Sequence, residues 1–62
     1  MTTSRYITIV EHGDYHIEYD TLNRRYAVFQ TANHLAQQVS RWYIYQPCAW
    51  NKLRQLTEDK NG

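Results

Sequence analysis

The stretch YHIEYD, residues 15–20, alternates apolar and polar side chains without interruption. A period of two is typical of a β-strand with one buried side and one solvent-facing side. Upstream, the stretch RYITIV at residues 5–10 is rich in β-branched side chains, which also favour a strand. Gly13 and Asp14 lie between the two stretches, and a glycine at the first position of a two-residue loop favours a type II′ turn. Residues 5–20 are therefore predicted to form an antiparallel hairpin.

The turn also sets a predicted register for this hairpin. It pairs His12 with Tyr15, Val10 with Ile17 and Thr8 with Tyr19. A second turn at residues 21–24 contains the Thr and Asn typical of turns and leads to a third strand over residues 25–29. Together these segments predict a three-stranded antiparallel meander.

Helical spacing follows the third strand. Thr31 is a candidate N-cap, and the apolar residues after it lie three or four positions apart, which predicts a long helix over residues 31–43. The stretch WYIY at residues 42–45 either extends this helix or forms a short fourth strand, and we favour the helix. Pro47 ends either structure.

A second, short helix is predicted beyond the proline up to about Thr57, because Ala49 or Trp50 lies at helical spacing with Leu53 and Leu56. The predicted fold class is thus α+β, with the meander followed by one long and one short helix packed on one sheet face. Residues 1–62 are predicted to form a single small domain, with residues 57–62 as a frayed tail.

The predicted register divides the sheet into two faces. The inner face, covered by Leu35, Ala36 and Val39, carries Tyr6, Thr8, Val10, Tyr15, Ile17, Tyr19, Tyr26 and Val28. The opposite face carries apolar and acidic residues together: Ile7, Ile9, Glu11, His16, Glu18, Asp20, Ala27 and Phe29. Large apolar side chains on a solvent-facing sheet surface usually mark a contact site. A register shifted by one, which would bring Ile7 and Ile9 into the core, stays open, as does a second helix that covers this face.

The composition argues against an enzyme and against a secreted or membrane protein. A chain of 62 residues has little room for both a core and a deep cleft. Cys48 is the only cysteine, which excludes an intramolecular disulfide and indicates a reducing, cytoplasmic location. The first residues contain no signal-like apolar run, and no apolar stretch is long enough to span a membrane.

Metal, cofactor and catalytic sites are not expected. His12 and His16 have a spacing that suits metal binding on a helix, but a turn interrupts them here. Cys48 lies at a predicted helix start, which can lower the pKa of a thiol, yet no base is spaced to activate it. Histidines on the surface and a packed cysteine are the simpler interpretation.

Nucleic-acid binding is the main alternative to protein binding, because the charge is unevenly distributed. Residues 24–57 contain no acidic residue and include the cations Arg24, Arg25, Arg41, Lys52 and Arg54, interleaved with aromatic residues. A three-stranded sheet followed by a helix resembles the integrase arm-binding and AP2-type DNA-binding domains, a resemblance of pattern only. Those families read DNA with basic residues on the sheet, whereas here the second strand carries His16, Glu18 and Asp20.

The leading hypothesis is therefore a non-enzymatic protein-binding module, such as a regulatory factor, an inhibitor or an accessory subunit. It would act through the acidic and apolar sheet face, or through the edge strand at residues 6–10, which can pair with a partner's sheet or with its own copy. A basic and aromatic second half that binds nucleic acid is the alternative.

Overall fold

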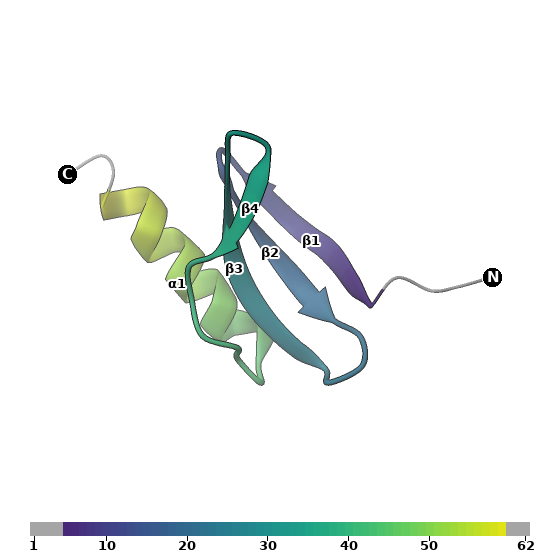
Figure 1. Cartoon of the computed structure of the whole chain (residues 1–62). Coiled ribbons are helices and arrows are strands. Elements are labelled where there is room, and N and C mark those ends of the chain that lie inside the picture. Colours follow the sequence, from purple (N-terminus) through teal and green to yellow (C-terminus); the bar gives the residue numbers. More distant parts are fainter. Residues whose placement is uncertain (1–4, 60–62) are drawn as a thin grey trace.

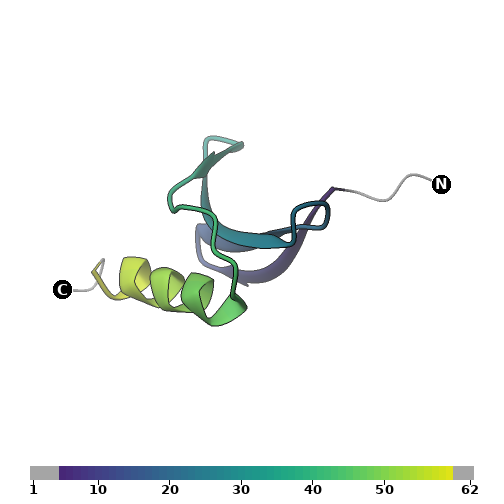
Figure 2. The same cartoon turned by 90° about the horizontal axis from the view of Figure 1, so that it is seen from below.

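The computed structural model describes residues 5–59 and has α+β architecture, as predicted. Four antiparallel strands lie side by side in chain order: β1 (Tyr6–His12), β2 (Tyr15–Asp20), β3 (Arg25–Ala32) and β4 (Leu35–Gln38). One helix, α1 (Gln46–Asp59), follows them (Figure 1). The sheet is curved, and α1 runs along one side of it (Figure 2). The prediction of three strands and two helices is therefore wrong in detail.

The first hairpin follows the prediction near its turn and departs from it further away. His12 pairs with Tyr15 and Val10 with Ile17, and Gly13 has the positive φ of 61° that the predicted turn requires.

A β-bulge lies in the middle of β1. The register shifts between Thr8 and Val10, so Thr8 pairs with Glu18 and not with Tyr19. Ile9 is the extra residue, and it packs against the core on the α1 side of the sheet. The shift turns Tyr6 and Thr8 to the opposite face and puts Ile7, the partner of Tyr19, on the α1 side. The alternative that brought Ile7 and Ile9 into the core is thus correct for Ile9, whereas Ile7 lies on the same side of the sheet but is exposed.

The predicted helix over residues 31–43 is wrong, because a second hairpin occupies its first half. Strand β3 continues to Ala32, which pairs with Leu35 across a two-residue loop. Both loop residues have positive φ, 54° for Asn33 and 67° for His34, as a type I′ turn requires. Leu35 and Ala36 are exposed, and of the predicted stripe of Leu35, Ala36 and Val39 only Val39 packs against the core. The backbone hydrogen-bonding groups of this segment are satisfied by pairing with β3 instead of within a helix.

This turn gives a prediction for stability. Glycine adopts positive φ without the steric cost that His34 bears, so His34→Gly is expected to raise the free energy of unfolding by roughly 0.5–1 kcal/mol. Urea denaturation of the purified variant measures this difference. As a control, Gln37→Gly within β4 should lower stability by a similar amount, because glycine weakens a strand interior. A lower stability of His34→Gly would contradict the turn assignment.

The segment after β4 follows the edge of β3 with two extra residues. The Val39 amide donates a hydrogen bond to the Val28 carbonyl, and Tyr43 exchanges two backbone hydrogen bonds with Tyr26. Between these points the chain advances four residues from Val39, while β3 spans only two. Ser40 fills the gap, because its hydroxyl accepts a hydrogen bond from the Val28 amide at 2.8 Å.

Tyr43, at the end of this segment, exchanges two hydrogen bonds with Tyr26 and packs against the core. Residues 42–45 therefore form neither a helix nor a regular strand, although Tyr43 makes a single β-bridge. Since successive side chains alternate between faces in such a bridge, Trp42 lies on the face away from α1.

Helix α1 provides the other half of the core. Pro47 lies in its first turn, where the missing amide hydrogen costs nothing, so the helix starts earlier than predicted. It continues to Asp59, so residues 57–59 of the predicted frayed tail belong to α1, while residues 60–62 lie outside the described residues. Ala49 and Leu53, one turn apart, pack on Ile17 and Val28. The core is thus covered mainly by α1, and of the predicted cover Leu35, Ala36 and Val39 only Val39 packs against it.

Candidate binding face

The sheet face opposite α1, called the open face below, holds the candidate site. Cross-strand partners share a face, so the register determines its members. They are Tyr6 and Thr8 from β1, His16, Glu18 and Asp20 from β2, Arg25, Ala27 and Phe29 from β3, and Gln38 from β4. Glu11, the partner of His16, belongs to the same face. Trp42 lies on it from the segment that follows β4.

Aromatic rings form a connected cluster across this face. The ring of Trp42 stacks on Tyr6, with centroids 6.1 Å apart, and meets Phe29 edge-on at 6.0 Å. Phe29 in turn stacks on His16 at 5.7 Å. Trp42 and Tyr6 remain 36% and 43% exposed, although each ring is held in place by the other. Such rings offer a rigid apolar contact surface.

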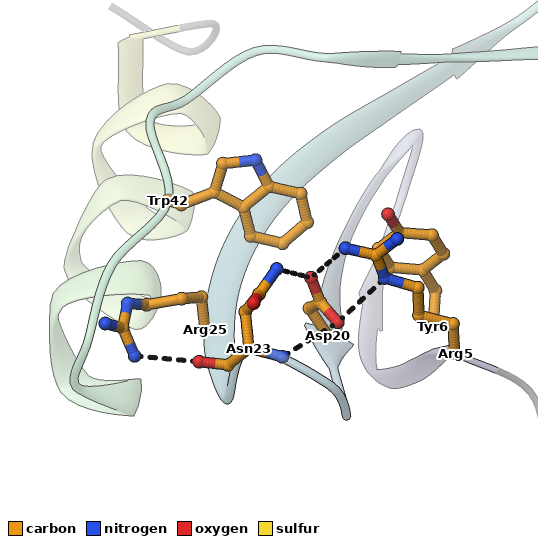
Figure 3. Close-up of a pocket in the computed structure, with 6 residues that line it drawn as sticks. All are labelled: Arg5, Tyr6, Asp20, Asn23, Arg25 and Trp42. Carbon is orange, nitrogen blue, oxygen red and sulfur yellow. Dashed lines mark hydrogen bonds and ion pairs between the residues drawn. The ribbon is translucent and has the colours of Figure 1, made fainter.

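Two adjoining hollows flank the Tyr6–Trp42 pair. The first has a volume of about 360 Å³ and is lined by Arg5, Tyr6, Asp20, Asn23, Arg25 and Trp42 (Figure 3). The second, of about 290 Å³, is lined by Tyr6, Glu18, Phe29, Gln38 and Trp42. Because the same two rings line both, the hollows follow one another along the open face.

Asp20 is buried at the floor of the first hollow and organises the turn between β2 and β3. Its carboxylate accepts hydrogen bonds from the Arg5 guanidinium at 3.2 and 3.3 Å. It also accepts the Leu22 amide at 3.0 Å and the amide and side chain of Asn23 at 3.3 and 3.0 Å. The hydrogen bond from Arg5 is the main cause that lowers the pKa of Asp20 to about 2, against the opposing effect of burial. Asp20, which was predicted as a binding residue, is thus engaged in holding the turn.

The two arginines of the first hollow differ in what they contact. Arg5 is paired with Asp20, and its guanidinium also lies 5.2 Å from the centroid of the Tyr6 ring. Arg25 donates from one nitrogen to the backbone carbonyl oxygens of Asn23 and Arg24, at 2.8 and 3.2 Å. Within residues 5–59, no carboxylate forms a salt bridge with Arg25.

Comparison with known proteins gives no guide to function. No protein-family model matches the chain, and no curated protein or solved structure matches it significantly. The function is therefore inferred from the chemistry of this face.

The structure brings together only part of the predicted protein-binding set. His16, Glu18 and Phe29 meet on the open face, with the imidazole of His16 3.9 Å from the Glu18 carboxylate. Glu11 is exposed at the edge, and Ala27 is fully buried. Ile7 and Ile9 lie on the other side, for the reason given by the bulge. Tyr6, Trp42 and Arg25 were not predicted as members of this face.

The five cations of the nucleic-acid alternative do not form one patch. Arg24 and Arg25 lie at the β2–β3 turn, and Arg25 lines the hollow that contains Arg5 at the start of β1. Arg54 lines a different hollow beside His12, at the far end of β1. Lys52 is on α1, and Arg41 is exposed between β4 and α1. Binding of nucleic acid through these five residues stays a prediction.

The edge of β1 is interrupted. Strand β1 is at the border of the sheet, as the edge hypothesis requires, but the bulge at Ile9 breaks the regular pattern of amides and carbonyls. Bulges of this kind disfavour the addition of another strand.

Other kinds of site find no support in the part of the chain that the structure describes. Over residues 5–59, no cluster of three His, Cys, Asp or Glu side chains could hold a metal ion. None of the helices within that range is long and apolar enough to cross a membrane. Cys48 is exposed and is not packed under the helix.

Proposed function

We propose that this domain is a non-enzymatic protein-binding module whose open face binds an extended peptide segment of a partner. The observation that carries the proposal is the pair of adjoining hollows on either side of the Tyr6–Trp42 stack. Aromatic-lined grooves of this kind suit extended peptides, whose successive side chains can enter successive hollows.

The state of the aromatic rings supports the same proposal. Trp42 and Tyr6 already touch each other, and Trp42 touches Phe29, so little side-chain freedom remains to be lost on binding. Trp and Tyr are the residue types that most often dominate the affinity of protein interfaces.

The chain contains its own control for a test, because its two tryptophans lie on different faces. Trp42 is on the open face, whereas Trp50 is on α1 and lines the hollow beside His12. The two side chains are similarly exposed, at 36% and 44%. The probe is a set of linear peptides selected from a random displayed library against the wild-type domain, with the tightest binder labelled for fluorescence anisotropy.

Trp42→Ala is expected to weaken binding of this peptide by about 30-fold, as expected for a residue that dominates an interface, and Trp50→Ala by less than about twofold. In a ¹⁵N-labelled sample, peptide should shift the indole resonance of Trp42 and leave that of Trp50 in place. Circular dichroism of both variants checks that they fold. Equal losses in the two variants, or a failure to select any peptide, would refute the proposal.

A further inference from the structure

We infer that the bound peptide is acidic at one end: an Asp or Glu side chain enters the first hollow beside Arg25, while an apolar neighbour lies on the Tyr6–Trp42 rings. This inference rests on the proposed function and adds the chemistry and the direction of the ligand. It follows from the charges around the two hollows.

The first hollow has one positive charge that its own residues do not neutralise. Two arginines and one carboxylate line it. The carboxylate of Asp20 is almost fully buried and is occupied by Arg5, Asn23 and the Leu22 amide. Figure 3 shows the Arg25 guanidinium pointing away from Asp20. Arg25 is therefore the cation without a carboxylate partner among the residues that line the hollow.

Arg25 is also held in position before any ligand arrives. Its two hydrogen bonds to the carbonyls of Asn23 and Arg24 use a single nitrogen, Nη1. A guanidinium has five N–H donors, so Nη2 and Nε keep donors for a carboxylate. Because the backbone already restrains the side chain, pairing with a ligand costs little additional entropy.

The second hollow has the opposite character, which favours a peptide over a nucleic acid. Glu18 lines it, and Glu11 lies on the same face one strand away. A chain of regularly spaced phosphates that reached Arg25 would bring further negative charges towards Glu18. A peptide can carry one carboxylate at the Arg25 end and a neutral or basic residue at the Glu18 end.

The test compares two neighbouring arginines. Arg25→Gln and Arg24→Gln each remove one positive charge from the same turn, but only Arg25 lines the hollow. Arg24 has positive φ, and glutamine there keeps the same backbone demand. The probe is again the tightest selected peptide, together with versions in which each Asp or Glu is changed to Asn or Gln.

Arg25→Gln is expected to weaken peptide binding about tenfold, because it removes a charge-assisted hydrogen bond. Arg24→Gln is expected to weaken it by less than about twofold. Changing one acid of the peptide to its amide should lower the affinity for the wild-type domain by a similar factor. The same change should not lower the affinity for the Arg25→Gln variant any further. Peptides selected for binding to the Arg25→Glu variant should carry Lys or Arg at the position of that acid.

The outcomes separate this inference from the proposed function. The inference of an acidic ligand is overturned if the selected peptides need Trp42 for binding but contain no Asp or Glu. It is also overturned if Arg25→Gln and Arg24→Gln weaken binding equally. In both cases the peptide-binding role remains intact. If no peptide depends on Trp42, both fall. Displacement of the peptide by a single-stranded RNA 12-mer, with an affinity that falls steeply as salt rises, would overturn the inference in favour of nucleic acid.

Discussion

Leu53→Ala is expected to leave most of the domain unfolded at 37 °C. Leu53 is only 3% exposed and belongs to a buried core of four residues, with Ile17, Val28 and Ala49. Truncation of a buried leucine costs about 2–5 kcal/mol, because the cavity does not fully collapse. A domain of this size has a total stability of only about 3–5 kcal/mol, so the variant loses most or all of it.

Leu35→Ala is the matched control, because it removes the same atoms from a side chain that is 74% exposed. Its effect should stay within about 0.5 kcal/mol. Thermal melts followed by far-ultraviolet circular dichroism measure both variants. If Leu53→Ala melted cooperatively at nearly the wild-type temperature, the packing of α1 on β2 and β3 would be wrong.

Stability is expected to fall in acid between about pH 4 and pH 2 through Asp20. Its pKa is about 2 in the folded chain and 3.8 when unperturbed, so the unfolded chain takes up the proton first as pH falls. A lowered pKa of this kind adds stability that is fully present above pH 3.8 and is lost as pH approaches 2.

Asp20→Asn tests this assignment. The variant should melt below the wild type at pH 7, because Arg5 loses its carboxylate and the amide nitrogen cannot accept the turn hydrogen bonds. The difference should narrow as pH falls towards 2, where the wild type begins to lose the same interactions. Glu11→Gln, which changes an exposed carboxylate, should melt like the wild type at pH 7. A gap between Asp20→Asn and wild type that stays constant from pH 7 to pH 2 would contradict the lowered pKa.

The parts of the fold that could be predicted are those with strong local signals. The alternation in YHIEYD and the glycine at residue 13 gave the first hairpin and its pairing next to the turn. The spacing of Ala49 and Leu53 gave the helix that covers the sheet. In each case the hydrophobic period and the turn chemistry agreed.

The second hairpin and the bulge in β1 could not be predicted, because the local sequence pattern is compatible with more than one structure at each place. Residues 31–43 have helical spacing, but Asn33 and His34 can adopt positive φ, and β3 is already present as a template for pairing. RYITIV is rich in β-branched residues and contains no glycine or proline to mark a bulge, although Ile9 is the residue inserted there.

The candidate site was predicted only where it depends on β2 and β3. His16, Glu18 and Phe29 follow from simple alternation along these two strands. The position of Trp42 does not follow from alternation, because the face on which it lies depends on the two additional residues after Val39. The adjacent pair of Trp42 and Tyr43 was the available signal, since neighbouring aromatics in an extended segment must face opposite ways.

The bulge in β1 determines which side chains of this strand belong to the open face. With Ile9 present, the strand sends isoleucines towards α1 and Tyr6 towards Trp42. Regular pairing of β1 at the same chain length would place Thr8 opposite Tyr19 and Ile7 opposite Asp20, so isoleucine would replace tyrosine beside Trp42. Deletion of Ile9 would instead remove the bulge and keep Tyr6 opposite Asp20, so among related sequences a gap of one residue at this position is compatible with the same surface.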